Sequence, residues 1–157
     1  MGDFSYCDFK IRKADLPLFT KHKETVFEKI QESHSNGSKG ESITFGFEEV
    51  RGGGIDEFTI FSNSGLTFIG YVDACAGVWH SSIFGSYFGK RFDIRTTDTF
   101  DFFLKTDDYG HPINDPELKK SLAIYRKAKS YVTGEFRKSP REKAEVARQV
   151  LLGHART

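Results

Sequence analysis

The amino-acid sequence predicts an α+β fold, with a mostly antiparallel sheet of five to six strands and one N-terminal and two C-terminal helices packed on it. Three observations lead to this class. Apolar residues recur at helical spacing near the two ends of the chain, strand-like segments follow one another between them, and turn-forming residues separate these segments. Strands in succession with helices at the ends are typical of α+β domains. The length of 157 residues predicts a single domain, residues 1–157.

The N-terminal part contains one strand and one helix. Residues 4–11 alternate between polar and apolar side chains, which is the pattern of a strand buried on one face. Residues 16–33 carry apolar side chains at helical spacing, and Asp15 precedes them as a candidate N-cap. Residues 34–41 are rich in Gly and Ser, so we expect a mobile loop there.

The middle of the chain is a succession of strands. Eleven of the sixteen phenylalanines lie between residues 41 and 114, and glycine-rich turns divide this part into short segments. Residues 66–75 are apolar on both faces, which places them at the centre of the sheet. The strands that we expect cover residues 43–48, 57–62, 66–75, 91–94 and 99–105.

Two helices follow. Asp115 is the N-cap of the first helix, Pro116 occupies its first position and Gly134 ends it. Residues 139–142, Ser-Pro-Arg-Glu, form a capping box for the second helix, which we expect to stop at Gly153.

Charge is distributed unevenly along the chain, although the net charge is only +1. Residues 41–114 carry 5 basic and 11 acidic side chains, whereas residues 115–157 carry 11 and 5. Such asymmetry favours an anionic partner at the basic end. The alternative is that the oppositely charged parts pack together.

The composition also limits the cellular compartment and the class of protein that we expect. Two cysteines make no disulfide framework, no secretory signal is visible, and no apolar run approaches the ~20 residues of a membrane span. We therefore expect a soluble cytoplasmic protein with no membrane association and no cofactor.

The segment that we single out first is residues 78–92, where five large aromatic side chains are interleaved with Gly, Ser and a basic pair. Their spacing shows little periodicity, so they are hard to bury together, and aromatic residues dominate protein-binding hot spots. The alternative is a folded loop that packs these side chains inward. The binding residues that this interpretation assigns are Trp79, Phe84, Tyr87, Phe88 and Arg91.

A second candidate is catalytic. Asp73, Cys75 and His80 place an acid, a thiol and an imidazole within eight residues of one another. A thiol nucleophile needs a base to form thiolate, and an imidazole needs an acid to fix its tautomer. The alternative is a buried free cysteine beside a surface histidine.

A third candidate is the acidic loop 106–115, in which Asp107, Asp108 and His111 could contribute to a metal site. The order of oxygen ligands does not match a calcium loop, and one histidine is few for zinc. Asp and Gly also form ordinary turns, so we assign no metal.

A fourth candidate is the basic surface of the C-terminal helices. Lys119 and Arg126 are seven residues apart, as are Lys120 and Lys127, so each pair shares a helix face on which a phosphate backbone could lie. The alternative is an ordinary solvated face.

The first hypothesis is a non-enzymatic module of the inhibitor, immunity or adaptor kind that binds a protein partner through the aromatic loop. The second is a small hydrolase or lyase that uses Asp73, Cys75 and His80. The third is nucleic-acid binding by the C-terminal helices. The sequence indicates neither the oligomeric state nor the identity of the partner.

Overall fold

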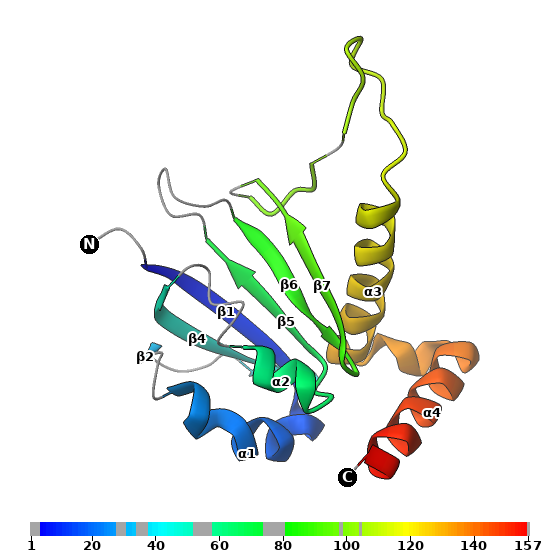
Figure 1. Cartoon of the computed structure of the whole chain (residues 1–157). Coiled ribbons are helices and arrows are strands. Elements are labelled where there is room, and N and C mark those ends of the chain that lie inside the picture. Colours follow the sequence, from blue (N-terminus) through cyan, green and yellow to red (C-terminus); the bar gives the residue numbers. More distant parts are fainter. Residues whose placement is uncertain are drawn as a thin grey trace.

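The computed structural model of the chain describes residues 4–27, 31–33, 38–51, 58–73, 81–97, 99–103 and 105–156. These residues form an α+β fold in which one antiparallel sheet lies between helices (Figure 1). The sequence-based fold class is therefore confirmed. Within the described residues, no helix combines the length and the apolar content that crossing a bilayer requires.

The sheet has five strands of five residues or more and two short ones. The strand order is β2-β4-β1-β5-β6-β7, with β3 paired to β4, and the neighbouring strands are antiparallel. The strands are β1 (Phe4–Arg12), β2 (Gln31–Ser33), β3 (Ser38–Lys39), β4 (Ser42–Arg51), β5 (Phe68–Val72), β6 (Ser82–Tyr87) and β7 (Lys90–Arg95). As predicted, β5 is central, because it pairs with β1 on one side and β6 on the other.

One described helix follows β1, a short helix lies between β4 and β5, and two helices follow β7. They are α1 (Leu16–Phe27), α2 (Thr59–Asn63), α3 (Pro116–Thr133) and α4 (Pro140–Arg156), with 3-10 turns η1 (Lys13–Asp15) and η3 (Glu135–Lys138). Figure 1 shows α1 and α2 on one face of the sheet and α3 beside β6 and β7. The helix α4 packs mainly on η3, and its Val146 joins the core cluster that α3 forms with the sheet, so the arrangement of the helices agrees broadly with the prediction.

The core on the α1–α2 face is built from phenylalanine rings. The ring centroid of Phe9, on β1, lies 4.6 Å from that of Phe68 and 5.2 Å from those of Phe58 and Phe61. Such offset and tilted pairs add to the free energy gained by burying the rings. The whole cluster comprises Cys7, Phe9, Ile11, Phe19, Phe45, Phe47, Phe58, Phe61, Leu66, Phe68, Val72 and Phe84.

The core on the opposite face joins the sheet to α3. Five side chains of β5, β6 and β7 pack against the buried stripe of α3, and one residue each of η3 and α4 completes the cluster. Its buried members are Ile69, Ile83, Tyr87, Phe92, Ile94, Tyr125, Ala128, Tyr131, Val132, Phe136 and Val146. The middle strands are thus buried on both faces, which removes the polar–apolar alternation expected of a one-sided sheet.

A cationic side chain connects the end of β1 to the junction of α3 and α4. The guanidinium carbon of Arg12 lies 5.2 Å from the ring centroid of Tyr131 and 4.8 Å from that of Phe136. Its Nε is 3.3 Å from Oε2 of Glu41, whose Oε1 is 2.7 Å from Arg137. This contact fixes the C-terminal helices against the sheet.

The helix caps largely follow the sequence. The Leu118 amide donates to Asp115 (3.2 Å), Pro116 opens α3, and Gly134 ends it at φ +80°. The capping box of α4 is only half formed. The Glu142 amide donates to the Ser139 hydroxyl, but the Glu142 carboxylate accepts a hydrogen bond from Ser130 of α3.

Several predicted elements are wrong. Residues 59–63 form α2 instead of a strand, and residues 31–33 belong to β2 instead of the first helix. In residues 99–105, the described residues form no strand and only Phe102 makes a single bridge, to Thr96. The last helix continues past Gly153 to Arg156. The predicted mobile loop 34–41 contains the short strand β3 and a turn at residues 40–41, and residues 34–37 lie outside the described part.

Candidate functional site

The structure does not present the described part of residues 78–92 as a loop. From residue 82 onward these residues form the hairpin β6–β7, with its turn at Phe88 and Gly89, both at positive φ. Phe84 and Tyr87 are each only 3% exposed. Because they are three residues apart in a strand, their side chains point to opposite faces of the sheet and enter different cores. Trp79 lies outside the described residues.

The other two described residues that the sequence analysis assigned to binding, Phe88 and Arg91, are held by contacts with neighbouring side chains. Phe88 is half buried, with its ring 4.9 Å from Tyr87 and 5.1 Å from Tyr131 between centroids. Arg91 is exposed, and its guanidinium donates to Asn63 Oδ1 over 2.7 Å. The five assigned binding residues therefore do not come together as one exposed aromatic surface in the part that is described.

The structure describes one of the three residues of the catalytic hypothesis. Asp73 is exposed at the end of β5, while Cys75 and His80 lie outside the described residues. The thiol that is described, Cys7, is fully buried in the core. Burial, reinforced by the charges of Asp8 and Asp73, raises the pKa of Cys7 well above its ordinary value, so this thiol is unsuited to act as a nucleophile.

The acidic loop of the sequence analysis is the tip of a projecting arm. We define the arm as residues 99–103 and 105–114, which leave the end of β7 and return at the start of α3 (Figure 1). Two isolated bridges, Thr96–Phe102 and Thr106–Pro112, brace it. In Figure 1 the arm projects past the ends of the strands at the top of the view, away from α1 and α4.

The tip of the arm is a tight turn organised by one carboxylate. Asp107 Oδ1 accepts hydrogen bonds from the backbone N–H groups of Tyr109 and His111, both at 2.9 Å. Its Oδ2 lies 3.4 Å from Nδ1 of His111, and Gly110 supplies a φ of +81°. Asp107 thus stabilises the turn itself. Within the described residues, no group of three His, Cys, Asp or Glu side chains is arranged to hold a metal ion.

Large apolar side chains are exposed along the arm. Phe103 is 47% exposed, Tyr109 86% and Ile113 48%. Phe102 is 38% exposed, and its ring packs on Tyr125 with 6.0 Å between centroids. The sequence analysis missed these residues because it assigned residues 99–105 to a strand and residues 106–115 to a turn. The signal was present as apolar side chains on both sides of an acidic turn.

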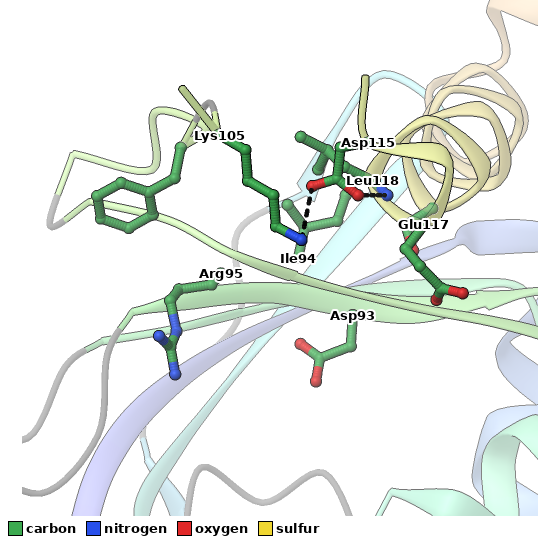
Figure 2. A pocket seen from close by; sticks show the side chains of 9 residues that line it. Asp93, Ile94, Arg95, Lys105, Asp115, Glu117 and Leu118 are labelled. Atoms are coloured by element: carbon green, nitrogen blue, oxygen red, sulfur yellow. Dashed lines mark hydrogen bonds and ion pairs between the residues drawn. The ribbon is translucent and has the colours of Figure 1, made fainter. Parts of the chain in front are cut away.

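A groove of about 320 Å³ lies where the arm meets the sheet and α3. Figure 2 shows Lys105 pointing toward Asp115 on one side of β7, with 3.9 Å between Nζ and Oδ2. Asp93 and Arg95 point away on the other side of the strand. The carboxylate of Asp93 remains accessible, but desolvation by the surrounding protein raises its pKa against the opposing charge of Arg95. The charged groups of the groove therefore do not converge on one point.

The predicted basic residues of α3, Lys119, Lys120, Arg126 and Lys127, are all exposed. Lys127 is engaged within the chain, because its Nζ lies 2.9 Å from Oε1 of Glu145 on α4. The other three form no ion pair with any described residue.

Comparison of the chain with protein-family models, with curated proteins and with solved structures finds no match.

Proposed function

We propose that this chain is a non-enzymatic protein-recognition module that binds its partner through the arm. The observation that carries the proposal is the exposure of Phe103, Tyr109 and Ile113 on a segment that projects from the folded body. The arm replaces the aromatic loop 78–92 of the sequence analysis as the binding surface, since Phe84 and Tyr87 are core residues.

Physical considerations favour recognition over a structural role for these side chains. An exposed apolar side chain gains free energy when a partner covers it, at roughly 25 cal/mol per Å² of apolar surface. Tyr109 at the tip can enter a pocket with little loss of conformational entropy, because tyrosine has few rotatable bonds. The hydrogen bonds to Asp107 order the turn before binding, which reduces the entropic cost further.

The charge of the arm indicates the chemistry of the partner. Asp101, Asp107 and Asp108 are exposed, and Lys105 is the one described Lys or Arg on the arm. A complementary partner surface would be an apolar pocket with a basic rim, because complementary charge accelerates encounter and disfavours wrong partners.

The test is capture of the partner from a nuclease-treated lysate of the native cells by the immobilised full chain. The variant Phe103→Ser/Tyr109→Ala/Ile113→Ser should lose a stoichiometric band that the wild type retains. A matched control, Leu16→Ser/Val150→Ser/Leu151→Ser, removes exposed apolar surface from the body and should retain the band. Loss of the band in the control variant but not in the arm variant, or no band with the wild type, would contradict the proposal.

A further inference from the structure

The outer surface of α3 and α4 carries a concentration of positive charge that the protein-recognition proposal does not use. Among the lysines and arginines of α3, η3 and α4 whose side chains are described, nine besides Arg137 are exposed. They are Lys119, Lys120, Arg126, Lys127, Lys129, Lys138, Arg141, Lys143 and Arg148, which we call the basic face.

Intramolecular ion pairs neutralise little of this charge. Within the described residues, Lys127 is the one member of the basic face with an ion pair, which it forms with Glu145. Arg137, next to the basic face, is neutralised by Glu41 at 2.7 Å. The remaining eight members form no ion pair with any described residue, so their charge is available to an external anion.

Four cations of the basic face line α3 from Lys119 to Lys127, and the contact with α4 begins at Lys127. Lys119 and Arg126 are two helical turns apart, as are Lys120 and Lys127, so each pair spans ~10 Å along the helix axis. Ala123 is exposed between the two rows. The helix α4 meets α3 at its C-terminal end, through Ser130 and Lys127, and leaves the N-terminal half of α3 uncovered (Figure 1).

We propose that the basic face binds nucleic acid through its phosphate backbone, without reading the base sequence. Lys119, Lys120 and Arg126 are exposed on α3 and form no ion pair with any described residue, so each is available to a phosphate. Lys and Arg provide most of the sequence-independent affinity for nucleic acid. A membrane-binding helix would place large apolar side chains between the cations, whereas small Ala123 occupies that position on α3. Large exposed apolar side chains do occur on α4, but they lie near its C-terminal end and not between the cations of α3. They are Val150, Leu151 and Leu152.

The test is fluorescence anisotropy of the full chain with a labelled 20-base-pair duplex and a labelled 20-nucleotide single strand, each of arbitrary sequence. Affinity for at least one probe should fall steeply as salt rises from 50 to 200 mM. The variant Lys119→Gln/Lys120→Gln/Arg126→Gln should lower the salt slope by about 2.7, at ~0.9 per phosphate contact on duplex DNA. Over this salt range, that change reduces the loss of affinity by about 40-fold.

The matched control is Lys13→Gln/Lys21→Gln/Lys90→Gln, which removes three exposed lysines elsewhere and changes the net charge equally. Its salt slope should stay close to that of the wild type. The proposal is overturned if the two triple variants behave alike, if the wild type does not bind at 50 mM salt, or if binding does not depend on salt. Binding to vesicles of phosphatidylserine and phosphatidylcholine but to neither oligonucleotide would also overturn it.

Discussion

Phe84 and Phe103 illustrate how differently the aromatic residues of this chain are used. Phe84 is 3% exposed, with its ring centroid 5.6 Å from that of Phe58 in the core of α2 and the sheet. Phe103 is 47% exposed at the groove beside β7. Burial determines whether truncation of such a ring affects the folded state or only a surface contact.

We therefore predict that Phe84→Ala lowers the free energy of unfolding by ~3–5 kcal/mol, because it leaves a cavity in a packed core. Phe103→Ala should change it by about 0.5 kcal/mol or less, since Phe103 is half exposed and belongs to neither core cluster. Urea denaturation followed by circular dichroism measures both. Equal effects of the two substitutions would mean that the assigned burial is wrong.

Asp15 supplies a test that depends on pH. Burial raises its pKa above the ordinary 3.8, although the Tyr131 hydroxyl and the charge of Arg12 act in the opposite direction. The folded state therefore binds the proton more tightly than the unfolded chain does. This contribution to stability is complete below the unfolded pKa, and it is lost as the pH rises through the folded pKa.

The variant Asp15→Asn keeps a neutral side chain at every pH. Relative to this variant, the wild type should lose free energy of unfolding as the pH rises from about 4 to about 7. Urea denaturation of both proteins across this range measures the difference. A difference that does not change with pH would contradict the assigned direction of the pKa shift.

At the scale of elements, two glycines of the C-terminal helices have opposite requirements. Gly134 ends α3 at φ +80°, and a Cβ there would collide with the Glu41 carboxylate. Gly153 lies within α4, where a Cβ would meet no atom within 4 Å.

Gly134→Ala should therefore destabilise the protein by ~1–2 kcal/mol or more, because alanine is strained at positive φ. Gly153→Ala should stabilise it by ~0.5–1 kcal/mol through helix propensity. Thermal unfolding of the two variants checks both signs. A neutral Gly134→Ala would show that the junction of α3 and η3 is not fixed as described.

The elements that the sequence predicted well have strong local signals. Asp115, Pro116 and Gly134 fix the ends of α3 by hydrogen bonding and backbone conformation alone, so no knowledge of the rest of the chain is needed. The short helix α2 could not be predicted in this way. Phe58 and Phe61 are three residues apart, and their rings both pack on Phe9. This tertiary contact outweighs the strand preference of the segment.

The hairpin β6–β7 was misread for a different reason. Its strand β6 is buried on both faces, so its side chains show no alternation between polar and apolar types. A run of aromatic residues without periodicity then resembles an exposed binding loop. A strand buried on both faces can be distinguished from an exposed binding loop only by the presence of helices on both sides of the sheet.

For the whole molecule, the uneven charge of the sequence is only partly used within the fold. Glu41, in the acidic part of the chain (residues 41–114), forms an ion pair with Arg137 in the basic part (residues 115–157). Lys105 of the acidic part likewise lies near Asp115 of the basic part. Most of the exposed cations of α3 and α4, and Asp101 and Asp108 of the arm, form no ion pair with any described residue. The sequence predicted the basic surface, because helical spacing places its residues. It could not predict the arm, whose projection depends on where β7 ends and α3 begins.

The most direct test of recognition by the arm is site-specific photocrosslinking in the native cells. A benzophenone amino acid would replace Tyr109 at the tip of the arm or, in a second protein, Lys90 in the β6–β7 hairpin, both of which are exposed. We predict one crosslinked protein from position 109, suppressed by excess unmodified chain, and none from position 90. A crosslink from position 90 without one from position 109 would contradict recognition by the arm. It would indicate that the β6–β7 hairpin binds the partner instead.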